Sequence, residues 1–87
     1  NDLNSQMRRC SKSAPANIAE GWAKSRSEKE FKAYLDRSLG SCNEMEVHLN
    51  MAKDLEYLNR NQCDELIQRY INLGGKIVNL RDKWKTY

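Results

Sequence analysis

Few side chains in this sequence could carry out chemistry. His48 is the only histidine, and it lies four residues after Glu44, so the two side chains would share one face of a helix. This spacing suits a salt bridge or, as an alternative, an acid–base pair. Glu44 and Glu46 fall on different helical faces and do not form a paired-carboxylate site. The di-iron spacing of a glutamate followed three residues later by a histidine is absent.

The cysteines are the other reactive group. Cys10, Cys42 and Cys63 are far apart in the chain, and each lies on an apolar helical stripe. Buried free thiols in a reducing cytosol explain this pattern best. No pair of cysteines, and no cysteine with a histidine, has the spacing of a zinc site. We therefore expect a non-enzymatic, cytoplasmic protein with no metal, no cofactor and no catalytic residues.

The basic residues are more informative, because seven of them fall between positions 8 and 32. Contacts to phosphates are expected from five of these residues: Arg8, Arg9, Lys12, Lys24 and Arg26. The sequence has no recognition-helix or base-stacking motif, so such a surface would bind RNA or DNA without reading its sequence. The net charge of +3 permits this role without requiring it. The alternative is a solvated helical face, on which Glu20, Glu28 and Glu30 are interspersed.

The first predicted helix covers residues 2–22. Apolar residues recur along it at spacings of three and four: Leu3, Met7, Cys10, Ala14 and Ile18. Pro15 interrupts the pattern, which predicts a kink near residues 11–14 or a helix restart capped by Ser13 or Ala14.

Small and polar residues mark the second half of this helix. Asn17 and Glu20 lie three apart, so a hydrogen bond between them or to a neighbouring helix is expected. Gly21 fits a helix end in left-handed geometry.

Two further helices are predicted at 28–54 and 60–86. Ser27 and Glu30 form a capping box at the first of them, and Asn59 with Gln62 marks the start of the second. Both helices carry apolar residues in a four-three rhythm typical of a bundle. Gly40 lies in mid-helix, where glycine costs about 1 kcal/mol against alanine. It predicts a packing notch, with a pocket beside Gly40 as the alternative.

Composition fits a single all-α domain over residues 1–87. Hydrophobic residues make up 39% and charged residues 31% of the chain, which is typical of a globular protein. No apolar run approaches the ~20 residues of a membrane span, so no membrane partner is expected. A chain this short buries only about 60–65% of its unfolded surface, which favours oligomerisation.

The stretch from Met7 to Gly21 resembles the signature of the bacterial four-helix-bundle proteins named after intervening sequences in 23S ribosomal RNA genes. That family includes the accessory variability determinant of diversity-generating retroelements. The residues that carry the resemblance most specifically are Pro15, Asn17, Glu20, Gly21 and Gly40. The match ends in Tyr57 and Leu58, where Glu56 occupies a place that is often glycine in the family.

The resemblance implies an up-and-down four-helix bundle whose N-terminal helix is missing from this sequence. An apolar groove would then remain between the other helices. It also implies a homo-oligomer, with a pentamer suggested by the retroelement protein, and RNA or a reverse transcriptase as partner. The alternative is a structural assembly protein in which Arg8 and Arg9 pair with carboxylates such as Glu20, Glu44 or Glu46.

Overall fold

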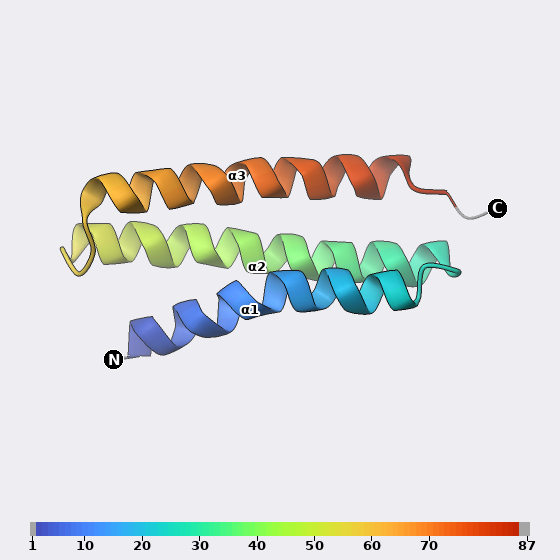
Figure 1. Ribbon diagram of the computed structural model, residues 1–87, viewed down its shortest axis with the longest axis horizontal. Coiled ribbons are helices and arrows are strands. Elements are labelled where there is room, and N and C mark those ends of the chain that lie inside the picture. Colours follow the sequence, from blue (N-terminus) through green and yellow to red (C-terminus); the bar gives the residue numbers. More distant parts are fainter. Residues whose placement is uncertain (1, 86–87) are drawn as a thin grey trace.

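Three long helices make up the computed structural model, which describes residues 2–85 (Figure 1). They are α1 (Asp2–Ala23), α2 (Glu28–Asp54) and α3 (Arg60–Lys83), and consecutive helices run antiparallel. The part of the chain that is described contains no strand, so the predicted all-α class is confirmed. None of these helices is long and apolar enough to cross a membrane.

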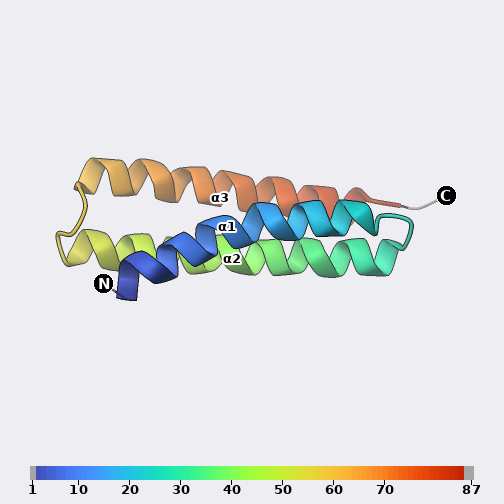
Figure 2. The same ribbon diagram turned by 60° about the horizontal axis from the view of Figure 1, so that its bottom comes forward.

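The helix α2 lies between the other two in the packing. It packs along both α1 and α3, whereas no Cα of α1 lies within 8 Å of a Cα of α3. Figure 2 shows α1 crossing in front of α2. The buried residues of α2 follow the predicted four-three rhythm: Phe31, Leu35, Ser38, Cys42, Met45, Leu49 and Ala52. The result is a flat, elongated body of 49 × 22 × 13 Å.

Pro15 bends α1 without breaking it. The helix is continuous from Asp2 to Ala23, so the predicted restart is absent. Figure 1 shows the first half of α1 running obliquely to its second half, as expected where a proline ring displaces the preceding turn. The predicted kink is therefore confirmed.

Gly21 does not end α1, contrary to the prediction. No glycine within residues 2–85 has a positive φ, and the helix continues to Ala23. A Cβ built on Gly21 would lie 2.8 Å from Tyr34 Cβ and 3.3 Å from the Phe31 ring. This residue is therefore required for the close approach of α1 to α2.

Gly40 is also placed differently from the prediction. A Cβ built there would meet nothing within 4 Å, because Gly40 lies on the exposed side of α2. The notch predicted at Gly40 is thus wrong. A tighter approach occurs at Gly74 of α3, whose built Cβ would lie 3.3 Å from Leu39 Cδ1.

The start of α2 follows half of the predicted capping box. Ser27 Oγ accepts a hydrogen bond from the Glu30 backbone N–H at 3.2 Å. The backbone N–H of Ser27 donates to the Lys24 carbonyl at 3.1 Å, so it does not need the Glu30 side chain.

The end of α2 depends on a residue in left-handed geometry. Glu56 has φ 58°, and the N–H groups of Glu56 and Tyr57 donate to the carbonyls of Lys53 and Ala52. These two bonds form the Schellman arrangement that usually ends in glycine. Glu56 thus adopts the conformation that the family's glycine would favour.

Only the N-terminal end of α3 agrees with the prediction. Asn59 Oδ1 accepts hydrogen bonds from the N–H groups of Asn61 and Gln62 at 2.8 and 3.2 Å. At the other end α3 stops at Lys83, short of residue 86, which lies outside the described residues. Trp84 turns to an extended conformation with ψ 132°, and its ring packs 4.6 Å from that of Phe31.

Candidate nucleic-acid interface

The first half of α1 presents three of the predicted cations to solvent. Arg8 and Lys12 are four residues apart and therefore share one helical face. Arg9 points to a different side, where it lines a hollow together with Cys10 and Glu44. All three basic residues are exposed.

The turn after α1 holds the other two predicted cations, and only Lys24 has a described polar contact. Lys24 Nζ donates to the Tyr34 hydroxyl at 3.1 Å and lies 5.2 Å from the ring centroid. Arg37 Cζ approaches the same ring to 4.5 Å. Hydrogen bonds from Lys24 and then Arg37 lower the pKa of Tyr34, because both cations favour the phenolate. Arg26 is exposed in the turn.

Tyr34 and Arg37 were not predicted as site residues. The run of basic residues that drew attention lies between positions 8 and 32, and Arg37 comes after it. The available signal was the spacing of three residues between Tyr34 and Arg37, which places an aromatic ring and a cation on one face of α2.

The five predicted cations do not converge on one point. Lys12 and Lys24 are twelve residues apart, which corresponds to about 18 Å along a helix. The structure therefore gives two basic groups, one on the first half of α1 and the other in the turn after it. Such an arrangement suits contacts to successive phosphates of an extended backbone better than capture of one small anion.

None of these five cations takes part in an ion pair within residues 2–85. The ion pairs involve other cations: Lys32, Lys53, Arg69 and Arg81. The intrachain pairing of Arg8 and Arg9 with Glu20, Glu44 or Glu46, which the alternative hypothesis allowed, is not found there.

A line of polar contacts joins α1 to α2 on the side of Lys24. Ser41 Oγ donates to Ser13 Oγ at 2.8 Å, and Asn17 Nδ2 donates to the carbonyl and the hydroxyl oxygen of Ser13. Asn17 thus bonds back along its own helix, and the expected bond to Glu20 is absent from the described contacts. We call this set of residues along α1 and α2 the polar seam: Cys10, Ser13, Asn17, Lys24, Tyr34, Arg37, Ser41, Glu44 and His48.

One end of the polar seam brings Cys10, Glu44 and His48 together. Cys10 Sγ donates to Glu44 Oε2 at 3.1 Å, and one potential ligand atom from each residue lies within 4.8 Å of the others. Burial and then the Glu44 carboxylate raise the pKa of the Cys10 thiol, while Arg9 acts in the opposite direction. Sequence spacing missed this cluster because Cys10 comes from another helix.

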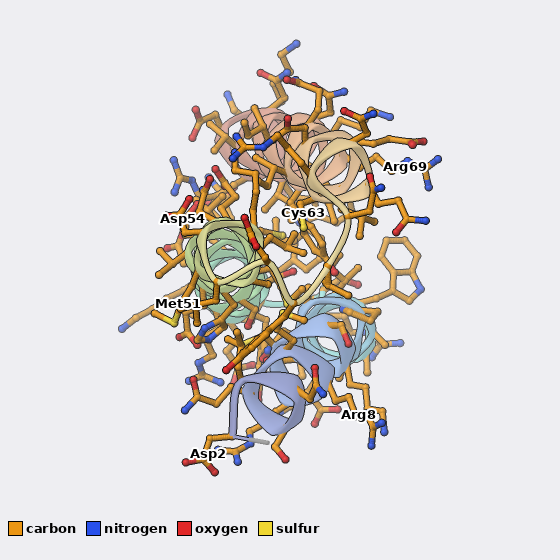
Figure 3. All side chains as sticks on the ribbon, turned by 90° about the vertical axis from the view of Figure 1, so that its left-hand side faces the viewer. Asp2, Arg8, Met51, Asp54, Cys63 and Arg69 are labelled. Carbon is orange, nitrogen blue, oxygen red and sulfur yellow. The ribbon has the colours of Figure 1, made fainter. Side chains whose placement is uncertain are left out.

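The opposite side of α1 faces an open apolar groove. Its walls come from α1 and α3, and we call it the α1–α3 groove, lined by Met7, Ser11, Ala14, Pro15, Leu66, Tyr70 and Leu73. Figure 3 looks along the helices and shows Arg8 and Arg69 projecting on this side, from α1 and α3 respectively. An apolar groove between the helices was predicted, and it is present.

Comparison with protein families supports the resemblance seen in the sequence between Met7 and Gly21. Residues 1–79 match the family model described as 23S rRNA-intervening sequence protein. The chain belongs to this family. Within the 23S rRNA-intervening sequence proteins, it is a small helical member whose described residues form three helices. Searches of curated proteins and of solved structures found no match to this chain.

Proposed function

We propose that this 23S rRNA-intervening sequence protein is a non-catalytic adaptor that binds nucleic acid through Arg8, Arg9, Lys12, Lys24 and Arg26. The observation that carries the proposal is that none of these exposed cations is used in an ion pair within residues 2–85. Unpaired cations can release condensed counterions from phosphates, which is the main source of sequence-independent affinity.

The spacing of the cations supports an extended ligand. Arg8 and Lys12 form one basic group on α1, and Lys24 with Arg37 forms another near the turn. A structured RNA or a DNA duplex offers rows of phosphates that can meet both groups. Tyr34 is held between Lys24 and Arg37, so these two cations keep defined positions.

The test is a filter-binding titration with a structured RNA and a DNA duplex at several salt concentrations. The variant Arg8→Glu with Lys12→Glu changes two exposed cations that lack ion pairs and leaves Arg9, beside Cys10, untouched. We expect binding to weaken strongly, and the slope of log affinity against log salt to fall by about two.

The matched control reverses two exposed cations of α3, Arg60→Glu with Lys76→Glu, and so makes the same change in net charge. If this control weakens binding as much as the α1 variant, the effect is one of overall charge and the proposed surface is wrong. Undetectable binding of the unmodified protein at low salt would also refute the proposal.

The α1–α3 groove favours a second candidate function, which is assembly with protein partners. Its apolar walls lack a helix packed between them within residues 2–85, and Leu66 on its wall is 38% exposed. The partner would be further copies of this chain, for which the resemblance to the retroelement accessory protein implies a pentamer, or another protein such as a reverse transcriptase. Light scattering after size exclusion tests this: a monomer at all accessible concentrations would exclude self-assembly.

A further inference from the structure

We propose that Cys10, Glu44 and His48 form a binding site for a divalent transition-metal ion of the zinc class. The three residues come from two helices that are packed together, with Cys10 on α1 and the other two one turn apart on α2. The three ligands are not among the proposed phosphate contacts, although Arg9 borders both sites, and metal binding needs no nucleic acid.

The distances suit a tetrahedral ion. One ligand atom from each residue lies within 4.8 Å of the other two, and Cys10 Sγ is 3.1 Å from Glu44 Oε2. Around zinc, with a sulfur bond of about 2.3 Å and an oxygen bond of about 2.0 Å, the corresponding separation is about 3.5 Å. Glu44 is exposed, so its side chain can make this small movement without disturbing the core.

His48 gives an independent indication. Its Nδ1 atom is buried and has no hydrogen-bond partner, which is rare for an enclosed polar atom. The residues surround a hollow of about 250 Å³, whose wall also includes Gln6 and Arg9. A metal ion bound at Nδ1 would supply the missing partner, and the hollow leaves room for a water as the fourth ligand.

The donor types select the class of ion. A thiolate, an imidazole and a carboxylate together suit zinc or cobalt and do not suit magnesium or calcium, which take oxygen ligands. Binding requires the Cys10 thiol to release its proton to solvent, where buffer accepts it. The thiolate and the Glu44 carboxylate then balance the two positive charges of the ion.

The experiment is a zinc titration of the reduced chain in competition with a chromophoric chelator, without nucleic acid. We expect one ion per chain, and a loss of affinity of at least about 100-fold in Cys10→Ala and His48→Ala. The variant Glu44→Gln, which changes an exposed side chain, should lose at least about 10-fold. Cobalt in place of zinc should give a thiolate charge-transfer band that Cys10→Ala abolishes.

Two variants serve as controls. Cys63→Ala removes a buried thiol that is not part of the cluster, and Glu46→Gln removes a neighbouring carboxylate, so both should bind zinc as the unmodified chain does. Circular dichroism checks that each variant is folded. The proposal is overturned if the unmodified chain binds no zinc at micromolar concentration, or if His48→Ala and Glu44→Gln, both folded, bind it unchanged.

Discussion

The two sides of α1 differ in how completely they are packed. On the polar seam, hydrogen bonds cross from α1 to α2 at Ser13 and Ser41 and at Cys10 and Glu44. On the α1–α3 groove no Cα of α1 comes within 8 Å of α3, and the walls are mostly apolar. The seam therefore helps to hold α1 against α2, whereas the groove leaves apolar area available to a partner.

Substitution of two leucines distinguishes a filled interior from an open groove. Leu35 is fully buried on α2, so Leu35→Ala should lower the free energy of unfolding by about 2–5 kcal/mol. Leu66 lines the groove and is 38% exposed, so Leu66→Ala should cost about 1 kcal/mol or less in a monomeric chain. Urea denaturation measures both. A Leu66 effect as large as that of Leu35 would mean that the groove is covered in solution.

Two glycines test whether the close approach of α1 to α2 is as tight as described. Gly21→Ala places a Cβ 2.8 Å from Tyr34 Cβ, so overpacking should destabilise the chain by about 1–3 kcal/mol. Gly40→Ala meets nothing within 4 Å, and its better helix propensity should stabilise by about 1 kcal/mol. Thermal denaturation should therefore move the two midpoints in opposite directions. Equal shifts would contradict the placement of Gly21 against α2.

Two tyrosines give the smallest and most local test, because their pKa values shift in opposite directions. Hydrogen bonds from Lys24 and Arg37 lower the pKa of Tyr34 on the seam below the usual 10.0. Burial raises the pKa of Tyr70 on the groove above the same value, with smaller contributions from Cys42 and Cys10. In an alkaline absorbance titration, Tyr34→Phe should remove an early ionisation and Tyr70→Phe a late one.

The direction of each pKa shift determines how that tyrosine changes the free energy of unfolding with pH. Ionisation of Tyr34 is favoured in the folded chain. Its contribution to the free energy of unfolding is therefore present above pH 10.0, and it is lost as the pH falls through the lowered pKa. Tyr70 is favoured in its neutral form, so its contribution is present below pH 10.0 and is lost as the pH rises through the raised pKa. Identical titration curves for the two variants would show that the seam and the groove do not differ in this respect.

Much of the fold was predictable because it follows from local patterns. The spacing of apolar residues predicted the buried side of α2. The capping side chains of Ser27 and Asn59 predicted where α2 and α3 begin. The roles of Gly21 and Gly40 were not predictable in this way, since each depends on what another helix places beside it. Glu56 also shows this limit, because its left-handed φ depends on how α2 ends and not on its own preference.

The site was predicted less completely than the fold. The five predicted cations, Arg8, Arg9, Lys12, Lys24 and Arg26, are exposed, as a solvent-facing surface requires. Arg37 joined the second group only when α2 was placed beside the turn. The cluster of Cys10, Glu44 and His48 was missed for the same reason, because 34 residues separate the first two.

The central position of α2 also bears on how the chain folds. The close backbone contacts run from α2 to α1 and from α2 to α3, so they join helices that are neighbours in the sequence. The rings of Trp22 in α1 and Trp84 at the end of α3 add a side-chain contact between the outer helices. Topologies of this kind have low contact order and fold within microseconds to milliseconds. Two helical hairpins, α1 with α2 and α2 with α3, offer separate starting points, and both require α2. The middle helix is therefore the shared template on which either end of the chain can assemble.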